Sequence, residues 1–93
     1  MAAEIVVRAV SDTEFEVTVR EGASQSQHVV TVEAAYARKL DPGSANPENL
    51  LRRSFAFLLE REPKESILRR FDLRQIGRYF PDFEREIRAR PGR

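Results

Sequence analysis

The residues from Phe15 to Arg20 constrain the fold most, because apolar and polar side chains alternate strictly along them. In a β-strand, Phe15, Val17 and Val19 would share one face and the polar residues between them the other. A strand with one apolar face needs a second layer to cover that face. The pattern therefore predicts a sheet with one buried side and one solvent-facing side.

Two further segments favour strands, because both are rich in β-branched residues. The expected strands span residues 4–10, 14–20 and 28–32, and the polar connections between them are short enough for an antiparallel meander. If Val17 and Val19 face the core, Val30 and Val32 should lie opposite them. That register places His28 on the same face, at the open end of the strand near the preceding loop.

The second part of the chain changes to helical spacing. Asn46 followed by Pro47 is a favourable helix start. Asp72 with Gln75 three residues later is typical of a capping box. We expect helical segments over residues 33–40, 47–61, 64–70, 73–79 and 82–88, with the second crossing the sheet.

These elements predict an α+β fold: a three-stranded antiparallel β-meander followed by a mainly helical C-terminal half packed on one sheet face. A chain of 93 residues is the size of a single domain, expected over residues 1–90, with 91–93 as a frayed tail. The expected core residues are Phe15, Val17, Val19, Val30, Val32, Leu51, Phe55, Leu58, Leu59, Leu68, Leu73, Ile76, Phe80 and Phe83.

Several classes of function lack the residues they need. The chain has no cysteine, which excludes disulfides, thiolate catalysis and Cys-based zinc sites. Its four glycines form no phosphate-binding pattern. The apolar run Ile5–Val7 is too short for a signal peptide, and no stretch approaches the roughly 18 apolar residues of a membrane helix. We expect no cofactor, no membrane association and a cytoplasmic location.

His28 is the only histidine, and it needs partners before it can act as a base or a metal ligand. Ser24 and Ser26 precede it at alternate positions, but no Asp follows, so the sequence predicts no catalytic triad. We expect a partly exposed side chain at a strand end.

The carboxylates of the helical half are interleaved with arginines. Four pairs have the favourable i,i+4 spacing, which indicates a solvated, internally compensated surface; these pairs are Glu48–Arg52, Glu65–Arg69, Glu84–Arg88 and Glu86–Arg90.

Basic charge is concentrated in the second half. Residues 1–46 carry four basic and seven acidic side chains, a net of −3, whereas residues 47–93 carry twelve and eight, a net of +4. Arginine fits phosphate geometry and aromatic rings stack on bases. The candidate contacts with a partner or with nucleic acid are Arg69, Arg70, Arg74, Arg78 and Tyr79.

Short helices on both sides of Asp72 would suggest a helix-turn-helix, but three features oppose this interpretation. The junction is one residue, where the motif has a turn of about three or four. Gly77 falls within the second helix, and the net charge of the chain is only +1, whereas nucleic-acid-binding domains usually carry a clear basic excess.

The stretch from Phe55 to Ile87 resembles the C-terminal half of a small family of uncharacterised bacterial proteins. The shared features are FLLEREPKESILRRFDL, then RYFP and an EREI ending. The resemblance covers about a third of the chain. It implies a bacterial origin, and it implies neither an activity nor a site residue.

The sequence therefore predicts a small, non-enzymatic interaction or regulatory module that binds another protein, through a free sheet edge or the Arg-and-aromatic helical face. The alternative is a nucleic-acid-binding domain, and an enzyme is the third class. A thin core and an open sheet edge are also compatible with a dimer.

Overall fold

The computed structural model describes residues 3–42 and 47–89. Its strands are β1 (Glu4–Ala9), β2 (Glu14–Glu21), β3 (Ser24–Thr31) and β4 (Arg70–Asp72), in the spatial order β1-β2-β3-β4. The first three are antiparallel and β4 runs parallel to β3. The predicted α+β class is confirmed, but the sheet has four strands and is mixed. The expected tail at 91–93 and the Asn46 cap lie outside the described residues.

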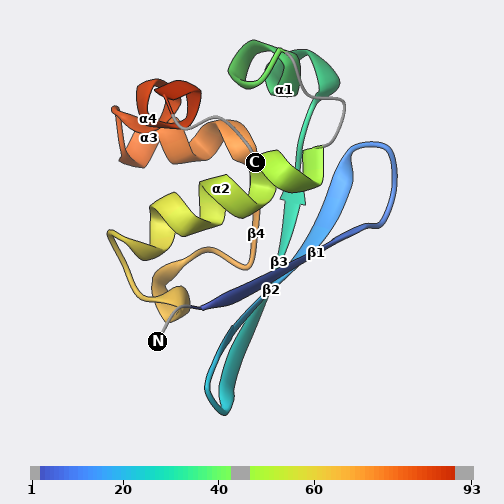
Figure 1. Cartoon of the computed structure of the whole chain (residues 1–93). Helices are drawn as coiled ribbons and strands as arrows, with labels where there is room; N and C mark the ends of the chain where they lie inside the picture. Colours follow the sequence, from blue (N-terminus) through green and yellow to red (C-terminus); the bar gives the residue numbers. More distant parts are fainter. Residues whose placement is uncertain (1–2, 43–46, 90–93) are drawn as a thin grey trace.

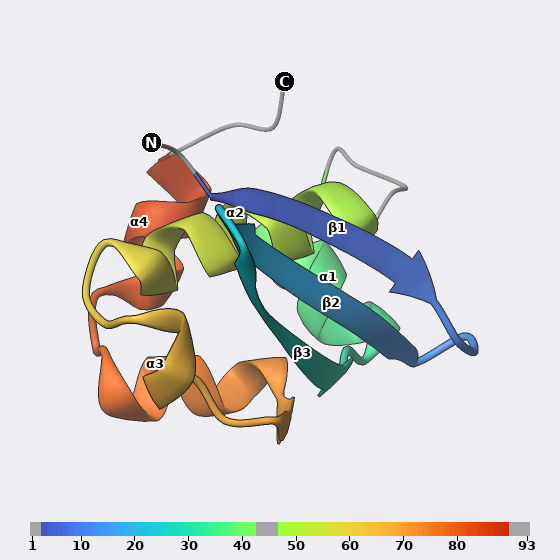
Figure 2. The same ribbon diagram turned by 90° about the horizontal axis from the view of Figure 1, so that it is seen from below.

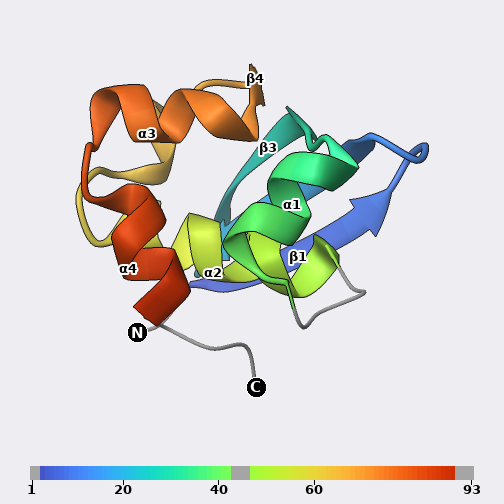
Figure 3. The same ribbon diagram turned by 90° about the horizontal axis from the view of Figure 1, so that it is seen from above.

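The helices lie on one face of the sheet (Figure 1). They are α1 (Ala34–Leu40), α2 (Pro47–Leu59), α3 (Ile76–Tyr79) and α4 (Phe83–Ala89), with 3-10 turns η1 (Lys64–Ser66) and η2 (Leu73–Gln75). Figure 2 shows β1–β3 in front of α1 and α2, and Figure 3 shows the opposite side, where α1, α3 and α4 form the outermost layer. The middle helix α2 therefore lies between the sheet and the other helices.

The turn between β2 and β3 is shorter than the sequence pattern predicts. Only Gly22 and Ala23 connect the strands, and Gly22 has φ +61°, as the first central residue of a type II′ turn requires. Because β3 begins at Ser24, Val17 lies opposite His28 and Val19 opposite Ser26. The sequence pattern predicts Val32 opposite Val17 and Val30 opposite Val19, so the predicted register is wrong by four residues. Because four is an even number, the same face still points to the core.

The expected helix over 64–70 is wrong. One 3-10 turn at Lys64–Ser66 is followed by extended backbone at Ile67 and by β4. The Val29 N–H donates to the Arg69 carbonyl (2.7 Å), and Phe71 pairs with Val30. Pairing with the free edge of β3 satisfies backbone groups that a short, isolated helix would leave at its ends. The segment before Asp72 is therefore a strand, which removes the helix-turn-helix interpretation.

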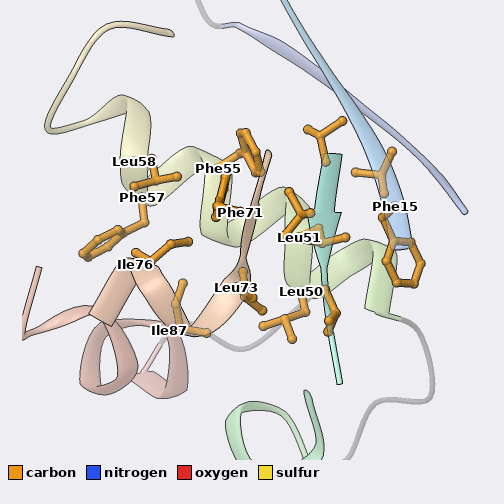
Figure 4. Packing of buried hydrophobic residues seen from close by; sticks show 14 of the residues in the cluster. Phe15, Leu50, Leu51, Phe55, Phe57, Leu58, Phe71, Leu73, Ile76 and Ile87 are labelled. Atoms are coloured by element: carbon orange, nitrogen blue, oxygen red, sulfur yellow. The ribbon is translucent and has the colours of Figure 1, made fainter. Parts of the chain in front are cut away.

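The core is centred on α2, whose Leu50, Leu51, Ser54, Phe55, Phe57 and Leu58 are buried. Figure 4 shows the apolar ones of these side chains between Phe15 and Phe71 of the sheet and Ile76 and Ile87 of the outer helices. The predicted crossing helix is confirmed. Its apolar stripe is wide because two layers enclose it.

Most predicted core residues are buried, with three exceptions. Leu68 is 47% exposed, and Leu59 and Phe80 are only partly buried against the core. The buried hydrophobic residues absent from the prediction are Val7, Tyr36, Leu40, Leu50, Phe57, Ile67, Phe71 and Ile87. Several belong to elements whose packing depends on β4 and α4 rather than on local spacing.

The predicted capping box is confirmed. The Arg74 N–H donates to Asp72 Oδ1 (2.9 Å), and the Asp72 N–H donates to Gln75 Oε1 (2.9 Å). Burial raises the pKa of the Asp72 carboxyl, but the hydrogen bonds from the Arg74 side chain and backbone outweigh it, so the pKa lies below its usual value. The box starts η2, which leads directly into α3.

Two of the four predicted i,i+4 ion pairs are replaced by other contacts. Glu65 contacts Lys64 (2.5 Å) and Glu84 contacts Lys39 (3.5 Å). The first follows from the loss of the 64–70 helix, and the second joins α4 to α1. Arg90 lies outside the described residues.

Candidate functional site

A groove of about 390 Å³ lies between the C-terminal end of α2, the chain around β4 and the η2–α3 turn. Its lining is mostly apolar, and we call it the apolar groove. The lining residues are Leu58, Glu62, Ser66, Ile67, Leu68, Phe71, Gln75, Ile76, Tyr79 and Phe80.

Two large, exposed apolar side chains of the described residues line this groove. Leu68 is 47% and Tyr79 66% exposed. Leu68 is exposed because the extended backbone before β4 turns Ile67 inward and its neighbour outward. Tyr79 ends α3, one turn after Gln75, so the two share a helix face. Single exposed apolar residues are ordinary, but two on one hollow make the apolar groove a candidate binding surface.

A second hollow, also about 390 Å³, lies beside β3 and η1, and we call it the polar hollow. Ile67 lines both hollows. The lining residues of the polar hollow are Gln25, Ser26, Gln27, His28, Lys64, Glu65, Ile67 and Arg69.

His28 is 1% exposed, so the expectation of a partly exposed strand-end residue is wrong. It is covered because β3 extends four residues beyond the predicted start and because the chain before β4 packs against it. Its Nδ1 lies 2.8 Å from the Leu68 carbonyl oxygen and its Nε2 2.8 Å from Ser26 Oγ. The ring also contacts Phe55 at a centroid distance of 5.3 Å.

Burial lowers the pKa of His28 below its ordinary value of 6.5, and the charge of Arg69 acts in the same direction. The hydrogen bond to Leu68 opposes this, but the net shift is downward. The imidazole is therefore neutral at pH 7.

Lys64, at the edge of the polar hollow, is 4% exposed. Its ammonium lies 3.2 Å from a Glu21 carboxylate oxygen and 2.5 Å from one of Glu65. Two carboxylates thus neutralise this cation and join η1 to the β2–β3 hairpin.

The structure separates the five residues predicted to contact a partner. Tyr79 lines the apolar groove and Arg69 the polar hollow. Arg70 pairs with Glu14 (3.2 Å), and Arg74 pairs with Glu33 (3.0 Å) and Asp72 (3.1 Å). Arg78 is exposed on α3, close enough to lower the pKa of Asp72.

Of the groove residues, the sequence analysis named only Tyr79 as a candidate contact, and it missed the partners of His28. Ser26 could have been found, since alternate residues share a strand face once β3 begins at Ser24. No sequence signal points to the Leu68 carbonyl, which lies 40 positions further along the chain.

Over residues 3–42 and 47–89, no cluster of three or more His, Asp or Glu side chains could hold a metal ion. Within the same ranges, no helix has the length and apolar character needed to cross a membrane.

Comparison with known proteins found no matching family model, no matching curated protein and no matching solved structure. The resemblance of residues 55–87 to a bacterial family therefore stays a prediction.

Proposed function

We propose that the protein is a small interaction module that binds a segment of another protein in the apolar groove. The observation that carries this proposal is the presence of Leu68 and Tyr79, both exposed, above a lining of buried apolar residues. Covering these side chains would remove apolar surface from water, which is the main favourable term in protein association.

The proposed occupant is an amphipathic helix of the partner. A helix places apolar residues at i, i+3 and i+4 on one side, which suits a groove between helical elements. Glu62 is the only charged lining residue, and among the described residues it has no ion pair. A lysine or arginine at the edge of the bound helix would pair with it. The volume suits a few anchoring side chains, as in weak, transient complexes.

Nucleic-acid binding is the alternative, and the arginine positions support it less well. A phosphate backbone needs basic groups along one open surface. Here Arg70 and Arg74 pair with Glu14 and Glu33, and Arg69 lies beside His28.

The test starts from a display library of helical peptides with randomised surface positions, panned against the purified protein. Recovered peptides are then titrated by fluorescence anisotropy against wild type, Tyr79→Ala and Val10→Ser. Val10 is the matched control because it is 56% exposed and lies beyond β1, outside the groove lining.

The proposal expects peptides with helically spaced apolar anchors and a basic residue. Wild type and Val10→Ser should bind them alike, and Tyr79→Ala about tenfold more weakly, equivalent to about 1.4 kcal/mol. Recovery of no such peptide, or binding unaffected by Tyr79→Ala, would contradict it. If the protein instead binds labelled duplex DNA, with an affinity that falls steeply as salt rises from about 50 to 200 mM, the nucleic-acid alternative is favoured.

A further inference from the structure

The hydrogen bonds of His28 fix its tautomer. A carbonyl oxygen can only accept, so Nδ1, 2.8 Å from the Leu68 oxygen, carries the proton. In a neutral ring Nε2 then holds a lone pair, and the Ser26 hydroxyl, 2.8 Å away, donates to it.

This arrangement contains the three parts of an activated serine: a hydroxyl, a base within hydrogen-bond reach and a group that orients the base. The third part is a main-chain carbonyl, where a triad commonly has a carboxylate. The Leu68 carbonyl therefore orients the imidazole, although no Asp follows His28 in the sequence.

The hydroxyl opens onto a space that a small molecule could enter. Ser26 is partly exposed and lines the polar hollow. In that hollow Lys64 is neutralised by two carboxylates, whereas Arg69 has no ion pair among the described residues and its charge acts on His28.

The edge of β3 offers a hydrogen-bond donor directly after Ser26. β4 pairs only with Val29–Thr31, so among the described residues no strand pairs with the part of β3 before Val29 on that side. The Val29 N–H points to that edge, because it donates to Arg69. N–H groups of alternate residues point the same way along a strand, so the Gln27 N–H faces the same open edge.

We propose that Ser26 is a catalytic nucleophile that hydrolyses small carboxylic esters in the polar hollow, with His28 as its general base. Ser26 Oγ attacks the ester carbonyl carbon while its proton passes to His28 Nε2. The carbon–oxygen bond to the alcohol breaks, and the alcohol leaves with that proton. Water then attacks the acyl-serine and gives a proton to Nε2; the serine oxygen regains it as the carboxylic acid departs.

Negative charge forms on the carbonyl oxygen in both steps. The Gln27 N–H and the Arg69 guanidinium are the groups that would stabilise it, in the role of an oxyanion hole. This activity does not require Tyr79, which lines the apolar groove and not the polar hollow.

The experiment is labelling with a fluorophosphonate, which reacts with activated serines, followed by intact mass and peptide mapping. Wild type and Ser24→Ala should give one adduct, on Ser26, and Ser26→Ala none. Ser24 is the matched control because it is an exposed serine two residues earlier on the same strand. Wild type and Ser24→Ala should also hydrolyse p-nitrophenyl acetate, whereas Ser26→Ala should not.

His28→Asn tests the base, and circular dichroism establishes that the variant is folded. Its labelling rate should fall by about 10²–10⁴, the usual contribution of a general base. Should His28→Asn not fold, the pH profile of wild type decides: labelling should rise as the imidazole loses its proton below pH 6.5 and then level off. The proposal would be overturned if wild type gave no adduct on Ser26 or if Ser26→Ala gave an equal adduct. It would also be overturned if the labelling rate were unchanged in His28→Asn or did not vary between pH 5 and 7. Tyr79→Ala should label normally, which separates this test from that of the groove.

Discussion

The most informative perturbation compares alanine at two adjacent positions, Ile67 and Leu68. A helix over 64–70 would turn both side chains inward, whereas the observed extended chain buries Ile67, 6% exposed, and leaves Leu68 47% exposed. Truncating a buried isoleucine costs about 2–5 kcal/mol. Full burial of a leucine is worth about 1.5–3 kcal/mol, so a half-exposed one contributes about 1 kcal/mol.

These costs are large relative to the stability of the domain. At about 0.05–0.15 kcal/mol per residue, 93 residues give roughly 5–14 kcal/mol in total. Each kcal/mol shifts Tm by about 4–8 °C in a domain of this size. Leu68→Ala should therefore lower Tm by about 4–8 °C, and Ile67→Ala by at least twice that.

Urea unfolding followed by far-ultraviolet circular dichroism measures both differences, with m expected near 1–3 kcal/mol/M. Equal losses in the two variants would refute the extended conformation and restore the helix. A larger loss in Leu68→Ala than in Ile67→Ala would refute the assignment of Leu68 to the groove surface.

Four further predictions concern the turn, a helical glycine, the helix cap and the buried imidazole. Gly22→Ala should cost roughly 1–2 kcal/mol because of its positive φ, although nothing crowds the site; Gly77→Ala, in open helical space, should stabilise by about 0.5–1 kcal/mol in the same unfolding assay. Asp72→Ala should cost about 0.5–2 kcal/mol by loss of the helix cap, and no loss would contradict the box. The lowered pKa of His28 contributes stability that is complete above pH 6.5 and is lost as pH falls through the folded value, so wild type should lose more stability between pH 7.5 and 5.5 than a folded His28→Gln.

The features that the sequence predicts well are those set by local spacing. The alternation of Phe15, Val17 and Val19 is enough to define a strand and its buried face, because the side-chain period is the same wherever the strand pairs. The Asp72–Gln75 box is similarly local, since its donors and acceptors lie within three residues.

The features that the sequence does not predict depend on distant partners. The backbone from Ile67 to Asp72 is extended because β3, about 40 positions earlier, offers an unpaired edge. The apolar pattern of Ile67, Leu68 and Phe71 fits a helix equally well, so periodicity alone cannot distinguish the two. Burial of His28 has the same origin, because the Leu68 carbonyl reaches it only in the extended form.

This single segment connects the two candidate sites. Leu68 places its side chain in the apolar groove and its carbonyl oxygen 2.8 Å from His28 Nδ1. The side chain and the carbonyl group of Leu68 are both bonded to the same Cα, so only a side-chain rotation can move the first without the second. The hydrogen bond from the Val29 N–H to the Arg69 carbonyl holds the backbone directly after Leu68. A groove occupant that displaces the backbone at Leu68 must therefore change the hydrogen bond that orients His28, whereas one that only rotates its side chain leaves the imidazole in place.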